Sequence, residues 1–576
     1  MFETLIPRIG EYKKETIKTP LYMIGEVVLE CIIPTVMAVM IDHMYEENLT
    51  DIIKIGALLV VLAVLSLICG SRSAKNAATA STGFAKNLRR DLFYKVQEFS
   101  FADIDRFSSS SLVTRLTSDV SHLQMAFQML IRMAVRSPLM LIFSVIMALR
   151  INVKMALIFF AIIPILFVGL IGIFKISHPI FRKIFKKYDA LNNSVQENVA
   201  GIRVVKSFVR EDYEIEKFKT ASEDVRSNFV KAERIIALNS PLMSFCMYSS
   251  MLLVSYLGAR IIISTKATEL TTGQLSSLTS YGVQIMMSLM MLSMVFMQIT
   301  FATEACNRIV EVLNYESNLT SKPDGLKEVK DGSIVFEDVC FRYGGDHDAL
   351  SDINIDIKSG QTIGIIGGTG SSKTTLIQLI PRLYDVTQGA VYVGGVDVRD
   401  YDLKALRDEV AVVLQKNILF SGTIKDNLRW GNKEASDEEI IRVCKLAQAD
   451  EFVQQMPDKY DTMISQGGTN VSGGQKQRLC IARALLKKPK VLILDDSTSA
   501  VDTKTDALIR KAFDTEIPDT TKIIIAQRVA SVENADQIFV MENGMIVEQG
   551  NHEQLMKHNG IYKEIYDSQT KMKEDE

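Results

Sequence analysis

The chain has 576 residues, of which 47% are hydrophobic and 23% charged, with a formal net charge of −3 and a mean hydropathy of +0.14. This length is too great for one ordinary domain, and the positive hydropathy beside many charged residues predicts a membrane part joined to a soluble part. The near-neutral charge gives no reason to expect nucleic acid as a partner, and seven scattered cysteines without a C-x-x-C pair argue against a disulfide frame or a zinc cluster.

Six long apolar stretches occupy the first ~310 residues, each close to the ~20 residues that a helix needs to cross a bilayer. They lie at about 19–42, 53–71, 127–149, 154–177, 235–264 and 273–300. The opening segment lacks the basic start and apolar core of a cleavable signal. An even number of spans places both ends of this half on the same side of the membrane.

Basic residues indicate which side that is. The connections 72–115 and 175–234 are rich in lysine and arginine, whereas the opposite loop "HMYEENLTD" is short and acidic. The positive-inside rule therefore places the long connections and both termini in the cytoplasm of a plasma (cell inner) membrane. A continuous helix from about 53 to 98 would be ~70 Å long, so the membrane helices are expected to project far into the cytoplasm.

The pattern of apolar residues changes near residue 331, where long apolar stretches give way to short ones. Short apolar runs such as "SIVFEDVCF", "TIGIIG" and "VAVVLQ" predict strands, and "TTLIQLIPRL" and "GGQKQRLCIARALL" predict helices. The expected domains are a six-helix transmembrane domain with long cytoplasmic extensions (1–313), a polar linker containing Pro323 and Gly325 (314–330), and a soluble α/β domain (331–576).

A glycine-rich turn follows the strand-like run "TIGII" and departs by one letter from the phosphate-binding pattern G-x-x-x-x-G-K-[ST], because Ser372 stands at the last glycine. Backbone N–H groups of such a turn cradle phosphates. Lys373 would reach the β- and γ-phosphates and Thr374 would bind Mg²⁺, as would Asp495 at the end of "VLILD". The expected cradle residues are Gly367, Gly368, Thr369, Gly370, Ser371, Ser372, Lys373, Thr374 and Thr375.

Between these motifs lies "VSGGQKQRLCIARALLKKPK", and here the chain resembles the ATP-binding cassette family. Its signature motif matches Ser472, Gly473, Gly474 and Gln475; its Q-loop matches Gln415; its D-loop matches residues 499–502, with Asp502; and its adenine-stacking aromatic matches Tyr343. With six spans before one cassette, the chain looks like an exporter half-transporter. The resemblance implies an all-α membrane bundle followed by a P-loop α/β domain, with ATP and Mg²⁺ as cofactors and Thr374, Gln415 and Asp495 around the metal.

The resemblance further implies that two cassettes close head to tail, each ATP held by one chain's phosphate loop and the other chain's signature. The family uses a glutamate after the Mg²⁺ aspartate and a histidine on a later strand for hydrolysis, but this chain has Asp496 and Gln527 there. Such changes are expected to slow hydrolysis, unless they are tolerated variants of a working site. Ser372 is either a third weakening or benign, because serine can donate to phosphate.

The signature, by contrast, is intact. The pattern resembles the degenerate-site subunit of heterodimeric bacterial multidrug exporters, so the expected partner is a second half-transporter chain and the expected substrates are small amphipathic or lipid-like compounds. A homodimeric lipid or drug exporter with slow hydrolysis, and an ATP-gated channel or regulator, stay open as alternatives.

The sequence also suggests residues for the transport path and for its coupling to the soluble domain. By resemblance, short cytoplasmic helices that relay motion fall at 101–107 and within 199–212. Met286, Met290 and Met294 recur at helical spacing and suit varied apolar ligands, or else serve ordinary packing. Glu26 and Glu30 lie one turn apart in the first span and would favour cationic substrates, or else pair within the bundle or sit near the membrane surface.

Overall fold

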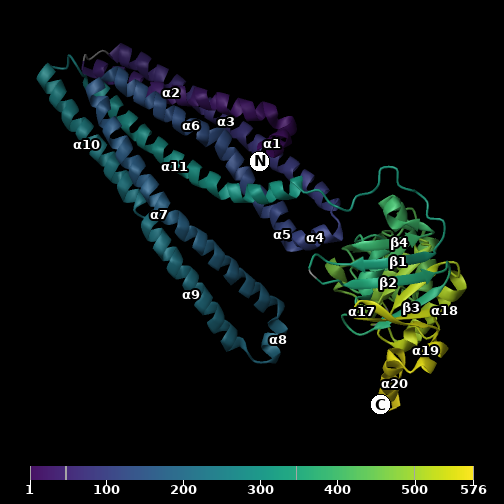
Figure 1. The fold of residues 1–576 in the computed structure, drawn as a ribbon. Helices are drawn as coiled ribbons and strands as arrows, with labels where there is room; N and C mark the ends of the chain where they lie inside the picture. Colours follow the sequence, from purple (N-terminus) through teal and green to yellow (C-terminus); the bar gives the residue numbers. More distant parts are fainter. Residues whose placement is uncertain (1, 46–48, 346, 498–499, 575–576) are drawn as a thin grey trace. The chain divides into compact units, whose positions relative to one another are not determined.

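The computed structural model describes residues 2–45, 49–345, 347–497 and 500–574. The chain forms two compact units (Figure 1): one contains Met1–Gln97 and Ser110–Tyr315, and the other contains Glu98–Ser109 and Glu316–Glu576. The segment Glu98–Ser109 therefore belongs with the soluble part, although the sequence places it between two membrane spans. The 314–330 linker stays a prediction.

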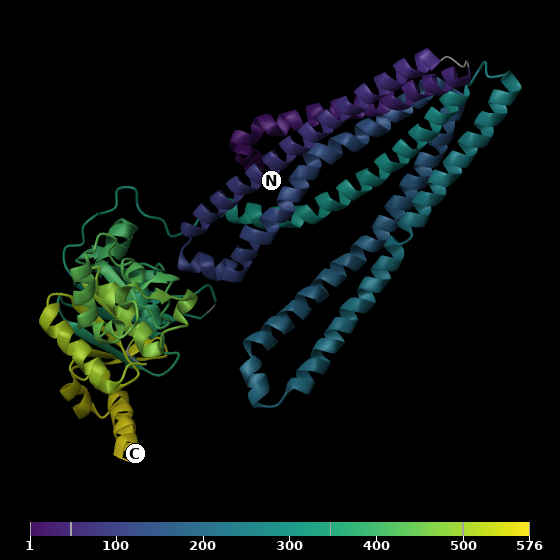
Figure 2. The same cartoon turned by 180° about the vertical axis from the view of Figure 1, so that it is seen from behind.

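Long helices build the first unit (Figures 1 and 2). The longest are α2 (Lys13–Tyr45), α3 (Leu49–Gln97), α6 (Val120–Ile151), α7 (Val153–Ala200), α9 (Glu211–Ile236), α10 (Asn239–Thr265) and α11 (Thr272–Asn314). Shorter pieces are α1 (Phe2–Leu5), the 3-10 helix Ile6–Tyr12, α5 (Ser109–Thr114), the π-helix Arg115–Asp119 and α8 (Ile202–Ser207). Within the described ranges, six helical segments are long and apolar enough to cross a membrane, which confirms the six predicted spans.

Two groups of helices are visible within this unit. α2, α3, α6 and α11 pack against one another, while α7 lies beside α9 and α10, with α8 at the turn between α7 and α9 (Figures 1 and 2). The predicted extension of the second span is present, because α3 runs without a break from Leu49 to Gln97. Part of the acidic loop, residues 46–48, lies outside the described residues.

The second unit contains a six-stranded sheet in the order β12-β11-β3-β10-β9-β6, in which only β12 is antiparallel to its neighbour. A four-stranded antiparallel sheet has the order β2-β1-β4-β5, and β7 pairs with β8. The strands are β1 (Ile334–Phe341), β2 (Leu350–Ile357), β3 (Thr362–Gly367), β4 (Gln388–Val393), β5 (Val396–Asp397), β6 (Val410–Val413), β7 (Gly422–Thr423), β8 (Met463–Ile464), β9 (Val491–Asp495), β10 (Thr521–Ile525), β11 (Gln537–Glu542) and β12 (Met545–Gly550).

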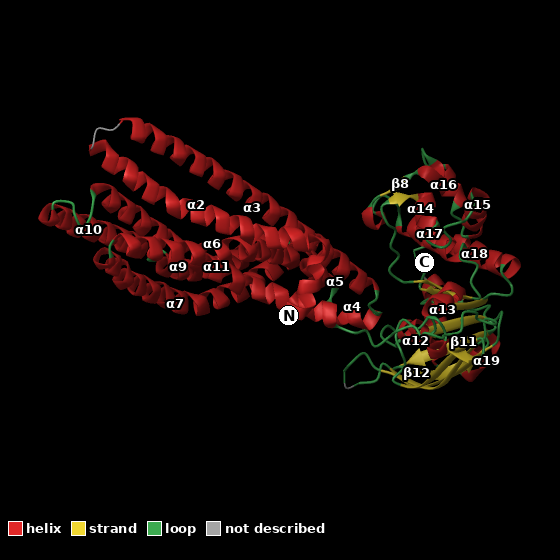
Figure 3. Ribbon diagram, turned by 90° about the horizontal axis from the view of Figure 1, so that it is seen from above, coloured by secondary structure: helices red, strands yellow, loops and turns green. Residues whose placement is uncertain are grey.

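Helices surround these sheets in two regions. Figure 3 shows α14, α15, α16 and α17 gathered at one end of the unit, and α12, β11 and β12 at the other. The helices are α4 (Phe101–Phe107), α12 (Lys373–Leu379), α13 (Leu403–Glu409), α14 (Ile424–Leu428), α15 (Asp437–Leu446), α16 (Asp450–Gln454), α17 (Gly473–Leu485), α18 (Thr503–Glu516), α19 (His552–His558) and α20 (Ile561–Glu574). β9 and β10 are buried at every position, as expected of parallel strands covered on both faces. The predicted fold class, a six-helix membrane bundle followed by a P-loop α/β domain, is confirmed.

Candidate nucleotide-binding site

Three neighbouring parallel strands bring the predicted nucleotide residues to one edge of the six-stranded sheet. β3 ends at Gly367, β9 ends at Asp495, and β10 ends two residues before Gln527. Ile525 of β10 pairs with β3 on one side and with Asp495 on the other, so the three strands end nearly level. In open α/β sheets, ligands bind outside the carboxyl ends of the strands, so this edge is the candidate site.

The loop after β3 gathers polar groups around one lysine. Lys373 Nζ donates to the carbonyl oxygens of Gly367 at 2.9 Å and Gly368 at 2.7 Å, and to Ser371 Oγ at 3.0 Å. Ser371 Oγ in turn donates to the carbonyl of Gly368 at 2.9 Å. Burial lowers the pKa of Lys373, and the charges of Asp495 and Asp496 oppose this shift. Thr369 and Gly370 complete the exposed turn, so the loop has the amide and ammonium donors that a phosphate chain requires.

The departure from the loop pattern has a backbone consequence. Ser372 has φ +67° and ψ +24°, a left-handed conformation that glycine adopts freely, and its side chain makes no capping hydrogen bond to α12. A non-glycine residue in this conformation costs about 1 kcal/mol. The serine therefore stores strain in the loop.

Replacing Ser372 with glycine is expected to strengthen nucleotide binding, because the loop would keep its shape without this strain. The expected gain in ATP affinity is up to about fivefold, the equivalent of ~1 kcal/mol. Equilibrium binding of a fluorescent ATP analogue to the purified chain measures it, with Lys266→Gly as the control, because Lys266 also has a left-handed backbone (φ +52°) but lies at the end of α10, outside the ATP-binding domain. A loss of affinity in Ser372→Gly would instead mean that the serine hydroxyl contributes a phosphate contact.

Two of the three residues expected at the metal, Thr374 and Asp495, meet directly. Thr374 Oγ1 donates to Asp495 Oδ2 at 2.9 Å, and the Asp495 side chain is buried. Burial raises the pKa of Asp495 and the hydrogen bond from Thr374 lowers it. A hydroxyl and a carboxylate side by side beneath a phosphate loop are the oxygen donors that Mg²⁺ takes beside nucleotide phosphates, so the residues fit this ion.

Asp496 and Gln527, the two residues predicted to stand at the hydrolytic positions, contact each other. Gln527 Nε2 donates to Asp496 Oδ2 at 3.0 Å. Asp496 has φ +47°, and its backbone N–H donates to the carbonyl of Ile525 at 3.1 Å. Burial raises the pKa of Asp496, while hydrogen bonding to Gln415 and the charge of Lys373 lower it. Gln527 and the Q-loop residue Gln415 therefore both act on this carboxylate.

Tyr343 lies beside the phosphate loop, where its ring can stack on a base. The residue is 52% exposed, and its hydroxyl is 3.0 Å from Thr375 Oγ1 on α12. Tyr384 packs edge-on against it, with ring centroids 5.2 Å apart, and donates to Asp105 Oδ2 of α4 at 2.6 Å. Sequence reasoning singled out the 101–107 helix but missed Tyr384, because no local pattern indicates which tyrosine will contact that helix.

Replacing Tyr384 with phenylalanine is expected to loosen α4, because the rings stay packed while the hydrogen bond to Asp105 is lost. Hydrogen bonds to charged groups contribute about 1.5–3 kcal/mol, so amide exchange in α4 should accelerate about tenfold or more. Hydrogen-exchange mass spectrometry of the 101–107 segment measures this. Tyr343→Phe is the control, since it loses only the hydrogen bonds to Thr375 and Gln378 of α12. Equal acceleration in both variants would mean that the hydrogen bond from Tyr384 to Asp105 does not hold α4 in place.

The signature residues form a second cluster, with the D-loop. Ser472 caps α17, accepting a hydrogen bond from the Gln475 N–H at 3.3 Å, while its own N–H donates to Gln475 Oε1 at 3.0 Å. The N–H of Ala500 donates to buried Gln477 at 3.1 Å, and Asp502 caps α18. D-loop residue Ser499 lies outside the described residues. Among those described, no hydrogen bond joins the signature to the phosphate loop, so the second unit contains two separate half-sites.

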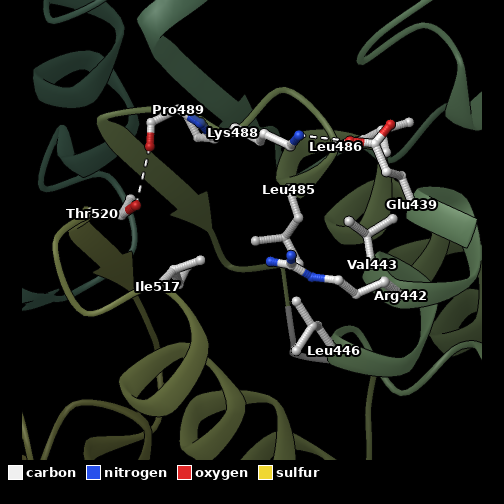
Figure 4. A pocket seen from close by; sticks show the side chains of 10 residues that line it. All are labelled: Glu439, Arg442, Val443, Leu446, Leu485, Leu486, Lys488, Pro489, Ile517 and Thr520. Atoms are coloured by element: carbon white, nitrogen blue, oxygen red, sulfur yellow. Dashed lines mark hydrogen bonds and ion pairs between the residues drawn. The ribbon is translucent and has the colours of Figure 1, made fainter. Parts of the chain in front are cut away.

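A cleft of about 120 Å³ elsewhere in this unit contains none of the predicted site residues (Figure 4). Its lining comes from α15, the end of α17 and the segment that follows, and Lys488 crosses its rim to Glu439 at 2.6 Å. The cleft therefore has no part in the nucleotide site.

The predicted substrate residues of the first unit, two glutamates and three methionines, lie in different surroundings. Glu26 and Glu30 of α2 both pair with Arg136 of α6, which is the alternative of pairing within the bundle. Met286 is 1% exposed in the apolar core between α7, α10 and α11, as ordinary packing requires. Met290 and Met294 are 43% and 63% exposed and stay candidates for contact with a substrate.

Two family models match the chain. The model of the ABC transporter transmembrane region matches residues 21–289, and the model of the ABC transporter domain matches residues 350–499. The chain is similar to the uncharacterized ABC transporter ATP-binding protein YfiB of Bacillus subtilis, with 36% identity over 550 residues that cover 95% of each chain. It is also similar to the ATP-dependent lipid A-core flippase of Desulfotalea psychrophila, with 33% identity over 488 residues that cover 84% of each.

A solved structure supports the fold. The chain is similar to a bacterial Atm1-family ABC exporter with ATP bound, with a TM-score of 0.83 and 21% identity over 97% of this chain and 98% of that one. Six membrane-type helices, a phosphate loop, a Mg²⁺-type aspartate and a signature helix thus occur together in one chain. The chain therefore belongs to the ABC transporter family, as an exporter-type half-transporter whose ATP-binding domain couples ATP hydrolysis to transport.

Proposed function

We propose that this chain is the degenerate-site subunit of a heterodimeric multidrug exporter, and that its own site binds ATP but rarely hydrolyses it. The observation that carries the proposal is the Asp496–Gln527 pair, joined at 3.0 Å at the phosphate edge, in a chain whose signature motif is intact. A signature motif serves the partner's ATP. A chain whose own ATP site is weakened but whose signature motif is intact can still support hydrolysis at its partner's site. This is what one half of an asymmetric dimer requires.

Two features of the pair make it a poor hydrolytic centre. Aspartate is one methylene shorter than glutamate, so its carboxylate is set back from the water that attacks the γ-phosphate, and a misplacement near 1 Å costs on the order of 10²-fold in rate. One oxygen of Asp496 also accepts the amide of Gln527. Gln527 is neutral at every pH, and losing general acid–base assistance costs roughly 10²–10⁴-fold.

Nucleotide binding itself is expected to persist. Tyr343 would stack on adenine, the loop 367–375 would hold the phosphates, and Lys373 would contact the β- and γ-phosphates. Thr374, Gln415 and Asp495 would hold Mg²⁺, which neutralises phosphate charge when bound. The hydrogen bond between Thr374 and Asp495 supports this assignment, because it brings two of the three oxygen donors together.

The proposed cargo is amphipathic. Exposed Met290 and Met294 offer adaptable apolar surface, and the lipid A-core named for one relative is itself an amphipathic lipid. The proposed setting is the plasma (cell inner) membrane, with both termini and the ATP-binding domain in the cytoplasm, as the basic connections indicate.

The direct test is to purify the tagged chain from its native membrane and measure the mass of the intact complex by mass spectrometry. A second half-transporter in equal amount is the expected result. Recovery of this chain alone, as a dimer of copies, would contradict the heterodimer and favour the alternative of a homodimeric exporter with slow hydrolysis or an ATP-gated device. ATP-dependent uptake of amphipathic dyes into inverted vesicles separates those two, because only a pump accumulates its substrate.

A further inference from the structure

A buried ion cluster joins two membrane helices of the first unit. Arg136 Nη2 of α6 donates to both oxygens of Glu30, at 2.9 Å and 2.8 Å, so that carboxylate is fully paired. Arg136 Nη1 donates to Glu26 Oε1 at 2.5 Å. Glu26 is only 8% exposed, and its second oxygen, Oε2, is buried with no hydrogen-bond partner among the described residues. Glu26 therefore has one carboxylate oxygen, Oε2, that can still accept a hydrogen bond.

The cluster also has a surplus of negative charge. One guanidinium serves two carboxylates, which leaves a formal charge of −1 when all three are ionised. Arg132, one turn earlier on α6, forms no ion pair with either acid within the described chain, and its own Nε is buried without a partner. A buried carboxylate with an unsatisfied oxygen is costly in a membrane helix and marks a site for a cation.

The neighbouring helix leaves room for this carboxylate. Gly70 of α3 faces it so closely that a Cβ there would lie 3.0 Å from Glu26 Oε1 and 3.1 Å from Oε2. Buried apolar side chains continue from the cluster along the same helices, namely Met23, Val27 and Met140. An acceptor oxygen beside apolar side chains suits a ligand with one charged end and an apolar body.

A metal ion is the less suitable occupant. No group of three or more His, Cys, Asp or Glu side chains that could hold a metal occurs within the described ranges. A single hydrogen-bond donor with one positive charge would satisfy both Glu26 Oε2 and the surplus charge. A protonated amine supplies both in one group.

We infer that Glu26 Oε2 binds the ammonium group of a singly charged amphipathic substrate, while Arg136 and Glu30 hold the Glu26 carboxylate in position. This inference rests on the proposed export function and names the substrate class within it. A neutral analogue of the same shape would lose the charged hydrogen bond and bind about 10- to 100-fold more weakly.

Binding of monodansylcadaverine and of its neutral N-acetyl derivative to the native complex in nanodiscs, followed by fluorescence anisotropy, tests this preference. Glu26→Gln is expected to reduce the preference for the amine to about threefold or less, because the charged hydrogen bond is lost. The variant should fold, since Arg136 keeps Glu30. Gly70→Ala is expected to weaken the preference with no change of charge, because its methyl group would displace the carboxylate.

Asp42→Asn is the matched control, an acid on the same helix whose two oxygens already accept from Thr271 Oγ1 at 2.7 Å and the Gly273 N–H at 2.9 Å. It should keep the full preference. Equal binding of the two dyes by the wild-type complex, no binding of the amine dye, or an unchanged preference in Glu26→Gln overturns the inference. ATP-dependent uptake of both dyes at equal rates would also overturn it but leave the proposed export of amphipathic compounds intact, whereas no ATP-dependent uptake of either dye would overturn that proposed function.

Discussion

Replacing Asp496 with glutamate is expected to raise ATP hydrolysis at this chain's own site on the order of 10²-fold, because the longer side chain brings the carboxylate to the attacking water. Gln527→His in the same chain should add to this by restoring a group that can titrate and carry charge at the γ-phosphate. The backbone at residue 496 has φ +47° and keeps this conformation in the variant at a modest cost. Vanadate trapping of a photoreactive ATP analogue measures the effect, since the labelled 64.4 kDa chain identifies the site that turned over.

Two controls make this result decisive. Asp402→Glu is the same chemical change at the N-cap of α13, away from the predicted nucleotide residues, and should leave trapping unchanged. Asp496→Asn removes the carboxylate and should reduce turnover of the native complex by less than about twofold, if most hydrolysis occurs at the partner's site. A collapse of turnover in Asp496→Asn would show that Asp496 works as the hydrolytic base, and the degenerate-site proposal would be wrong.

The second large effect is expected from Gly474→Ala in the signature. A Cβ at this position would lie 2.7 Å from the carbonyl oxygen of Ala500, closer than real contacts allow, so the signature helix α17 and the D-loop must move apart. Overpacking of this kind costs about 1–3 kcal/mol. Because the signature is proposed to serve the partner's ATP, a displaced signature should lower ATP hydrolysis by the complex by at least about tenfold.

The neighbouring glycine provides the comparison. A Cβ at Gly473 would be 3.5 Å from the Cβ of Ala500, an ordinary van der Waals contact. Thermal unfolding should therefore shift downward in Gly474→Ala and not in Gly473→Ala. ATP binding to this chain's own phosphate loop should be normal in both variants, and a loss of that binding in Gly474→Ala would contradict the separation of the two half-sites.

Much of the molecule follows from local sequence. A membrane span needs only a run of apolar residues of the right length, and all six predicted spans are present. The phosphate loop, the strand ending at Asp495 and the signature helix are likewise encoded within short windows, and each forms where it was predicted. Parallel strands that end level with one another then bring Gly367, Asp496 and Gln527 to the same edge of the sheet, although 160 residues separate the first from the last.

Other features depend on contacts between distant segments. The sequence shows two acids on α2 and two arginines on α6, but it contains no signal that Arg136 rather than Arg132 lies between Glu26 and Glu30, about 110 residues away. Helix packing sets that register. The grouping of residues 98–109 with the soluble unit, and the contact of Tyr384 with Asp105, are of the same kind.

The sequence by itself therefore determined the six spans and the ATP-binding domain, and it led to the proposal that Asp496 and Gln527 stand at altered hydrolytic positions. Only the tertiary structure decided which oxygen of which acid is unpaired, that Ser372 has a left-handed backbone, and that Asp496 is held by Gln527. The physical reason is the distance along the chain over which each kind of interaction acts. Hydrophobic length and turn chemistry act over a few residues, whereas hydrogen-bond satisfaction and backbone strain depend on neighbours that folding supplies from elsewhere in the chain.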